Sequence, residues 1–199
     1  MLARQIGLLS PAVGFDAACA GITRHDLGAG AWVDHLPGWL KGHEAVFEAL
    51  YRDMRWSQRR RWMYEREVDE PRLTASVPRD GAGHPVFPAL GQALSRRYER
   101  PLTSISLGLY RDGRDSVAPH GDVILREGGE GLVATVSVGE PRRFLIRRKD
   151  GKRRLQLDLG WGDLCVMGGT CQHTCLHGVP KVARALPRIA IMFRAPNPR

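Results

Sequence analysis

Apolar residues recur every three or four positions in two segments of the first half of the chain, 42–54 and 88–100. This is the period of a helix that buries one face. The apolar stripes are Val46, Phe47, Leu50 and Tyr51 in the first segment, and Leu90, Ala93 and Leu94 in the second, with Arg97 continuing the spacing. The pattern predicts two helices, and we expect both to lie against a sheet.

From Leu102 onward the pattern changes to short runs rich in Val, Ile, Leu and Phe, separated by Gly, Pro and Asp. Such runs are typical of strands. The predicted strands span 104–110, 132–138, 143–148, 154–159, 163–167, 174–178 and 188–194. Seven or eight short strands without long helices between them favour an antiparallel barrel or sandwich, such as a jelly roll. We therefore expect a mainly β fold with flanking helices.

The length and composition fit one folded domain. The chain has 199 residues, of which 43% are hydrophobic and 26% are charged, and both values are typical of globular proteins. We expect a single domain over 1–199, with an N-terminal helical extension in 1–101 and the strand-rich core in 102–199. No apolar run approaches the ~18 residues that a membrane span needs, so no membrane partner is expected.

The start of the chain imitates a secretory signal, with an apolar stretch followed by small residues at 18–20. Pro11, Gly14 and Asp16 interrupt that stretch where a signal should stay apolar. The chain has four cysteines, three of them between Cys165 and Cys175, and this spacing does not resemble the framework of a disulfide-stapled secreted domain. We expect a cytoplasmic protein with reduced cysteines.

The chain is strongly basic, with 30 Lys and Arg against 21 Asp and Glu and a formal net charge of +9. Such a balance favours phosphate polymers or anionic membrane surfaces as partners. Segment 55–66 is the most basic and aromatic stretch, in which Trp62 and Tyr64 lie among arginines. Aromatic faces among cations suit base stacking and phosphate contact. The same residues could equally cover the sheet from outside, and charge alone does not identify the partner.

One pair of residues in the strand-rich half has the spacing of a metal site. His120 and Asp122 lie two positions apart, so extended backbone would point both side chains to one face. His177 lies on another predicted strand. Two histidines and one carboxylate form the facial triad that holds ferrous iron and leaves coordination positions open. A lone His-x-Asp is weak evidence, because a surface histidine followed by a turn aspartate looks identical.

A rival metal site overlaps His177. Cys171, His173, Cys175 and His177 alternate at spacing two, so a single strand could present four zinc ligands on one face. On a straight strand these ligands would extend about 20 Å at ~3.3 Å per residue. That is too far to surround one tetrahedral ion, which usually takes its ligands from two separated pairs.

In the last predicted strand, odd-numbered and even-numbered positions carry different kinds of side chain. Ile189, Ile191 and Phe193 share one face, whereas Arg188, Ala190, Met192 and Arg194 share the other. The arginine face is either solvated or lines an interior, where each guanidinium must meet an anion. A small dicarboxylate chelated on the metal would satisfy both arginines, and Tyr110 could donate its hydroxyl to the same carboxylate. An ordinary core tyrosine is the alternative at that position.

Together these motifs resemble the AlkB family of Fe(II)- and 2-oxoglutarate-dependent dioxygenases. In the strand-rich half, the matching motifs are 109–115 with Tyr110, His120-x-Asp122, His177 and Arg188-x5-Arg194. In the N-terminal half, segments 37–40, 63–66 and 71–74 resemble that family's entry segment and nucleotide-recognition lid. The resemblance covers 30–195 and implies a double-stranded β-helix core with iron held by His120, Asp122 and His177. It also implies that Arg188 binds the distal carboxylate of 2-oxoglutarate with help from Tyr110, and that Arg194 lies near the metal-chelating end.

Three positions depart from the family pattern. Gly108 and Ala190 stand where members often carry asparagine, which removes two side-chain amides beside the co-substrate. Ile124 stands where some members carry an acidic residue that helps to read the damaged base. Base preference therefore does not carry over from the resemblance.

The resemblance implies an oxygenase that uses Fe(II), 2-oxoglutarate and molecular oxygen to demethylate N-alkylated bases in DNA. The target atom is inaccessible in a stacked duplex, so the DNA would be single-stranded or the base flipped out. Trp62, Tyr64 and Arg66 are the expected substrate-binding residues, and we expect a monomer. The alternatives are the same chemistry on RNA, protein or a small molecule, an inactive zinc-containing nucleic-acid-binding domain, and a cupin-like metal isomerase, which leaves the paired arginines unexplained.

Overall fold

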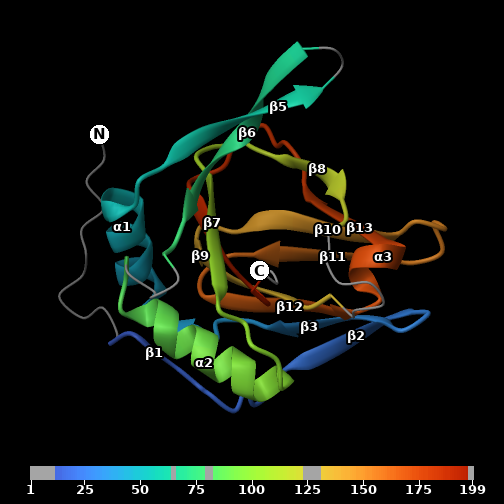
Figure 1. The fold of residues 1–199 in the computed structure, drawn as a ribbon, viewed down its shortest axis with the longest axis horizontal. Coiled ribbons are helices and arrows are strands. Elements are labelled where there is room, and N and C mark those ends of the chain that lie inside the picture. The colour runs from blue at the N-terminus through green and yellow to red at the C-terminus, as the bar shows by residue number, and fades with distance from the viewer. Residues whose placement is uncertain (1–11, 64–65, 79–82, 123–130, 197–199) are drawn as a thin grey trace.

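The computed structural model describes residues 12–63, 66–78, 83–122 and 131–196, and within 61–68 it describes only the strand backbone. Two antiparallel sheets form the body of the fold (Figure 1). The elements are β1 (Gly14–Phe15), β2 (Thr23–Gly28), β3 (Ala31–Leu36), β4 (Leu40–Lys41), α1 (His43–Asp53), β5 (Ser57–Met63), β6 (Arg66–Ser76), α2 (Val86–Tyr98), β7 (Ser104–Tyr110), β8 (Val117–His120), β9 (Val133–Gly139), β10 (Arg142–Arg148), β11 (Arg154–Leu159), β12 (Asp163–Gly169), α3 (Cys171–Thr174), β13 (Cys175–Val179) and β14 (Arg188–Arg194).

The large sheet has the strand order β2-β3-β12-β9-β14-β7-β6-β5, and the small sheet has the order β11-β10-β13-β8. Strand β1 pairs with β4 in a separate two-stranded sheet. The strands that the apolar pattern predicts after Leu102 are all present, and the mainly β prediction is confirmed. Burial alternates along β10 and β11, which offer one face to a core, whereas β9, β12 and most of β14 are buried on both faces and read as apolar runs.

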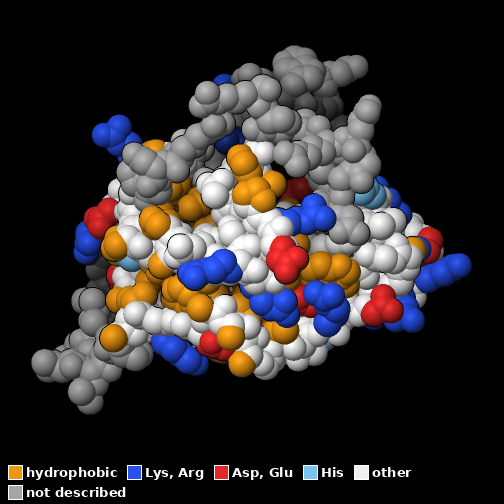
Figure 2. All heavy atoms as spheres, turned by 60° about the horizontal axis from the view of Figure 1, so that its bottom comes forward, with side chains coloured by type: hydrophobic (Ala, Val, Ile, Leu, Met, Phe, Trp, Pro, Cys, Tyr) orange, Lys and Arg blue, Asp and Glu red, His pale blue; other side chains and the backbone are white. Residues whose placement is uncertain are grey.

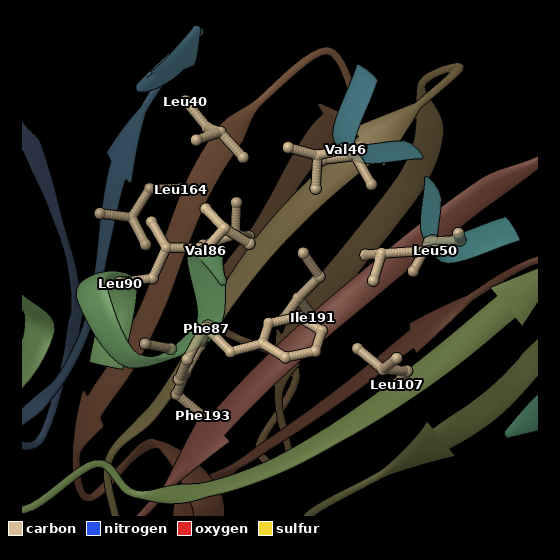
Figure 3. Close-up of a cluster of buried hydrophobic side chains, with 14 of the residues drawn as sticks. Leu40, Val46, Leu50, Val86, Phe87, Leu90, Leu107, Leu164, Ile191 and Phe193 are labelled. Atoms are coloured by element: carbon tan, nitrogen blue, oxygen red, sulfur yellow. The ribbon is translucent and has the colours of Figure 1, made fainter. Parts of the chain in front are cut away.

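Helices α1 and α2 pack on one face of the large sheet, as the apolar stripes predict. Their side chains meet Ile191 and Phe193 of β14 in one buried cluster, together with Leu107 of β7 and Leu164 of β12 (Figure 3). Helix α2 begins at Val86, two residues before the predicted start. Pro88 lies in its first turn, where the backbone N–H that proline lacks has no partner within the helix.

Strands from the first half of the chain extend the large sheet on both sides. At one edge β3 pairs with β12, and toward the other edge β6 pairs with β7. The apolar pattern does not predict β2 and β3. In β3 a charged residue, Asp34, interrupts the apolar positions although it is fully buried. Arg24 donates two hydrogen bonds of 2.7 and 2.8 Å to this carboxylate, and the Tyr98 hydroxyl donates a third of 3.0 Å. These partners offset the cost of burying the charge.

None of the helices in the described part of the chain combines the length and the apolar character that crossing a bilayer requires.

Candidate metal centre and co-substrate cavity

Strand pairing brings the two histidines of the predicted triad together. His120 ends β8 and lies directly opposite His177 of β13, with 4.4 Å between the two ring centroids. Asp122 follows β8 by two residues, and its Oδ1 lies 3.5 Å from His120 Nε2 and 3.9 Å from His177 Nε2. One donor atom from each of the three residues lies within 4.8 Å of the other two. The three side chains can therefore hold one metal ion.

Hydrogen bonds orient two of these donors. His120 Nδ1 lies 2.9 Å from the Ala118 carbonyl, so an Nδ1–H donates there and leaves Nε2 as the ligand atom. The two oxygens of the Asp122 carboxylate have different partners. Oδ1 faces the histidines, while Oδ2 accepts hydrogen bonds from Arg194 Nη2 at 2.8 Å and Nε at 3.2 Å. Arg194 also donates to the Ser106 hydroxyl at 3.0 Å. Arg194 thus fixes the plane of the carboxylate beside the histidines.

A glutamine that sequence reasoning missed holds the backbone of the triad. Gln172 lies in α3 and is buried, and its Oε1 accepts a 2.9 Å hydrogen bond from the Asp122 backbone N–H. Residue 121 between the two ligands is glycine, and a Cβ there would overlap the Gln172 carbonyl oxygen. The close approach of these two segments therefore depends on both Gly121 and Gln172. Nothing in the local sequence pattern marks Gln172, which is 50 residues from Asp122.

The charges of the triad suit metal binding. Burial opposes ionisation of Asp122, but His120 and Arg194 together hold the pKa of its carboxyl below the usual range. Burial, together with the nearby positive charge of His120, lowers the pKa of His177 to about 4. The contact with Asp122 raises the pKa of His120. At neutral pH the site therefore offers an ionised carboxylate and a neutral His177, which are the forms that bind metals.

A cavity extends from the triad to a buried arginine. It is lined by Ala190, Met192 and the two arginines of β14. The arginine-bearing face of this strand therefore lines an interior and is not solvated. The other lining residues are Arg72, Tyr110, Val117, His120, Asp122, Val133, Thr135, Phe144, Met167, His177, Gly178 and Val179. The cavity thus joins a metal site to a cationic end.

Arg188 at that end is only 1% exposed and lacks a full set of partners. Its Nη2 donates a 2.6 Å hydrogen bond to the Ser137 hydroxyl, while its Nε is buried without a partner. Its guanidinium carbon lies 5.2 Å from the centre of the Tyr110 ring. Burial lowers the pKa of Arg188. A buried guanidinium with an unpaired N–H is a strong anion site, so these residues fit a carboxylate that enters the cavity.

The rival hypothesis of a zinc site at Cys171, His173, Cys175 and His177 is wrong. Cys171 lies in helix α3 and Cys175 begins β13, so the segment does not form one straight strand, and both cysteines are buried and free. Among the described residues, the group of His, Cys, Asp and Glu side chains close enough to share a metal is the triad of His120, Asp122 and His177.

The expected substrate-binding residues lie at the hairpin between β5 and β6. Trp62 lies near the end of β5, Arg66 begins β6, and Tyr64 is outside the described residues, as is Ile124. The hairpin projects beyond the rest of the large sheet (Figure 1), and β6 contacts β8, which carries His120. Its backbone therefore reaches past the strand that leads to the triad.

Comparisons with known proteins agree with this geometry. Residues 45–194 match the family model of the 2OG-Fe(II) oxygenase superfamily. The alpha-ketoglutarate-dependent dioxygenase alkB homolog 3 of Bos taurus is 31% identical over 82% of this chain, and the chain spans 66% of the length of that relative. The DNA oxidative demethylase ALKBH2 of Arabidopsis thaliana is 27% identical, over 85% of this chain and 68% of the relative.

A solved structure carries the same fold. The prolyl hydroxylase of Trichoplax adhaerens, in complex with a fragment of the hypoxia inducible factor oxygen degradation domain, has a TM-score of 0.63 and 12% identity, over 81% of this chain and 82% of that one. The jelly-roll prediction is therefore confirmed, and the superfamily uses Fe(II), 2-oxoglutarate and oxygen. The chain belongs to the 2OG-Fe(II) oxygenase superfamily and, within it, to the AlkB family.

Proposed function

We propose that this oxygenase demethylates N-alkylated bases in DNA. The observation that carries the proposal is the single cavity with a His-Asp-His triad at one end and the unpaired buried guanidinium of Arg188 at the other. In the proposal His120, Asp122 and His177 hold Fe(II), and Arg188 binds the distal carboxylate of 2-oxoglutarate beside Tyr110. Arg194 keeps the Asp122 carboxylate turned toward the metal.

When bound, Fe(II) and 2-oxoglutarate use O2 to insert one oxygen atom into a substrate C–H bond, as 2-oxoglutarate becomes succinate and CO2. The chain's own residues then have two tasks. The triad and Arg188 hold the co-substrate in one orientation. The apolar side chains of Val133, Phe144 and Met192 line the cavity and exclude water. On a methylated base nitrogen, the resulting N–CH2OH group loses formaldehyde and leaves N–H.

The nucleic-acid substrate is supported by three observations. The curated relatives include an alkB homolog and a protein named as a DNA oxidative demethylase. The net charge is +9. The β5–β6 hairpin carries Trp62 and Arg66 and reaches past β8. A base must leave the stack before its methyl group can approach the triad, and we propose that Trp62, Tyr64 and Arg66 receive it.

The arginines in the sequence of segment 55–66 favour the hairpin end as the binding region. On the face that Figure 2 shows, basic side chains lie interspersed with carboxylates and apolar groups, so the described residues of this face form no continuous cationic strip. Phosphate contacts along a strand require cations that follow its backbone. We therefore place the nucleic acid at the hairpin and not across this face.

The proposal is tested by following two products of one reaction. Protein loaded with Fe(II) without oxygen receives 2-oxoglutarate, oxygen and a single-stranded oligonucleotide that carries 1-methyladenine or 3-methylcytosine. We expect succinate to form in step with loss of the methyl group by mass spectrometry, and neither product with His120→Ala. Succinate without methyl loss on DNA would overturn the DNA substrate, and the same assay with a methylated RNA oligonucleotide or a duplex then identifies the accepted strand.

A further inference from the structure

Arg72 of strand β6 reaches into the co-substrate cavity from the side opposite to β14. In the large sheet β7 lies between β6 and β14, and Gly108 of β7 pairs with Thr74 on one side and with Ala190 on the other. The side chain of Arg72 lies over Gly108, because a Cβ on that glycine would be 3.7 Å from Arg72 Nη1 and 3.8 Å from Cδ. The guanidinium occupies space that a longer side chain at position 108 would fill.

Arg72 contacts the same tyrosine as Arg188. Its Nη1 donates to the Tyr110 hydroxyl at 3.3 Å, whereas the Arg188 guanidinium lies 5.2 Å from the ring centre of that tyrosine. All three side chains line the cavity. Two arginines therefore approach one phenol, and a carboxylate that accepts from the Tyr110 hydroxyl would be within reach of both.

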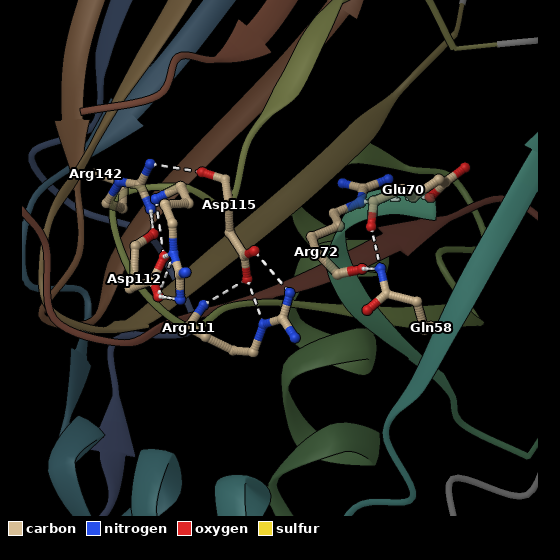
Figure 4. A network of polar contacts seen from close by, with 8 residues as sticks. Gln58, Glu70, Arg72, Arg111, Asp112, Asp115 and Arg142 are labelled. Atoms are coloured by element: carbon tan, nitrogen blue, oxygen red, sulfur yellow. Dashed lines mark hydrogen bonds and ion pairs between the residues drawn. The ribbon is translucent and has the colours of Figure 1, made fainter. Parts of the chain in front are cut away.

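The backbone around Arg72 is held before any ligand arrives. Gln58 of β5 donates its side-chain amide to the carbonyls of Glu70 and Arg72, as Figure 4 shows for this strand pair. The Ser116 N–H, in the segment before β8, donates to the Pro71 carbonyl at 2.6 Å. These bonds fix the strand that carries the guanidinium, so little ordering is needed when an anion binds.

The ion pair of Arg72 lies at Nε, and its Nη1 faces the phenol of Tyr110 in the cavity. Arg194 meets the Asp122 carboxylate at 2.8 Å, so its charge is matched within the site. Arg72 forms a long ion pair with Glu70, whose carboxylate lies 3.9 Å from Nε, while its Nη1 meets a neutral phenol. The Nη1 of Arg72 and the buried guanidinium of Arg188 can therefore both meet a dianion such as 2-oxoglutarate.

We propose that Arg72 is a second arginine of the co-substrate site and binds a carboxylate of 2-oxoglutarate beside Tyr110 and Arg188. A Cβ at position 108 would already be in contact with this guanidinium, so a side chain longer than alanine there would crowd it. The role depends on the co-substrate of the superfamily and not on the identity of the methylated substrate.

Affinity for 2-oxoglutarate tests this role without turnover. Mn(II) replaces iron in the absence of oxygen, and calorimetry measures the dissociation constant of 2-oxoglutarate for the parent protein, Arg72→Met and Arg72→Lys. A charge-assisted hydrogen bond that is lost weakens binding by roughly tenfold to a hundredfold. We expect that loss in Arg72→Met and a smaller one in Arg72→Lys. Arg52→Met, on the exposed side of α1, is the matched control and should bind as the parent does.

A measurement on the unmutated protein covers the case in which Arg72→Met does not fold. Phenylglyoxal modifies accessible arginines, and the side chain of Arg72 is 20% exposed while Arg188 is 1% exposed. Peptide mapping should show that 2-oxoglutarate with Mn(II) protects Arg72 from the reagent and leaves Arg52 reactive. Equal modification of Arg72 with and without the ligand would overturn the proposal.

A third measurement separates this role from contact with nucleic acid. Fluorescence anisotropy gives the affinity of the Mn(II)-loaded variants for a single-stranded oligonucleotide. If Arg72→Met keeps its affinity for 2-oxoglutarate and loses affinity for the oligonucleotide, the co-substrate role is refuted and Arg72 belongs to the substrate surface. If 2-oxoglutarate binding alone weakens, the co-substrate role stands even where the oligonucleotide is never demethylated.

Discussion

Replacing Arg188 with methionine should stabilise the ligand-free protein while removing co-substrate binding. Arg188 is 1% exposed and has an unpaired Nε, and its one described hydrogen bond goes to Ser137. An ion that is buried without full compensation costs several kcal/mol. The lost bond to Ser137 offsets about 1–3 kcal/mol of that cost. Arg188→Met keeps the apolar stem, so we expect the free energy of unfolding to rise by about 1–3 kcal/mol.

2-Oxoglutarate should raise the melting temperature of the parent much more than that of the variant. For a domain of this size each kcal/mol moves the melting temperature by roughly 2–4 °C, so the ligand-free variant should melt roughly 2–12 °C higher. At a hundred times its dissociation constant, 2-oxoglutarate should stabilise the parent protein by about 2.7 kcal/mol. A variant that binds a hundredfold more weakly gains only about 0.4 kcal/mol at the same concentration.

Thermal unfolding of the Mn(II)-loaded proteins without oxygen measures both effects. Arg142→Met is the matched control, because Arg142 is also buried but donates to the carbonyls of Asp112, Asp115 and Pro180 at 2.8–3.0 Å (Figure 4). Its loss removes three hydrogen bonds to carbonyls, so this control should melt lower than the parent. A lower melting temperature for ligand-free Arg188→Met would refute the burial argument. An unchanged response to 2-oxoglutarate would refute the assignment of Arg188 to the co-substrate.

Four further outcomes are expected. His120→Ala should lose Mn(II) binding by calorimetry and keep its circular dichroism spectrum, and retained binding would exclude His120 as a ligand. Gln172→Leu should bind Mn(II) roughly 10–100-fold more weakly, because it no longer holds the Asp122 backbone; unchanged affinity would remove Gln172 from the site. The four buried cysteines should resist a thiol reagent at pH 8 until the protein unfolds, since burial raises the pKa of Cys165 to about 12, and fast reaction of any thiol would contradict this. Gly169→Ala should lower the free energy of unfolding in urea by about 2–3 kcal/mol, because φ is +60° and a Cβ would overlap the Gly30 carbonyl; a neutral effect would show that the turn can shift.

Some parts of the site could be read from the sequence because their signals are local. His120 and Asp122 lie two positions apart, so extended backbone places both on one face. In β14 the same period places Ile189 and Phe193 on one face and Arg188 and Arg194 on the other. The structure puts Ile189 and Phe193 in the helix-covered core and Arg188 and Arg194 in the cavity. The bounds of β7, β11 and β14 agree with the apolar runs for the same reason.

Other parts were invisible because their signals are not local. Strand β6 contains few apolar residues, and it becomes a strand by pairing with β5 and β7. Cys171 has the alternation of a strand but lies in a helical turn that brings Gln172 to Asp122. Arg72 reads as part of a surface lid until the sheet places it over Gly108.

The sequence by itself determined the fold class and the residue types of the metal centre, because side-chain periodicity and ligand spacing are properties of short segments. The family followed from the resemblance of its motifs to those of a known family. Only the tertiary structure decided which polar side chains face one another across the sheets. Strand register brings Arg72 to Tyr110, and the placement of helix α3 against the sheets brings Gln172 to Asp122, over long stretches of chain. Register is set by the pairing of whole strands and by burial on both faces, so these contacts arise only when the complete core has formed.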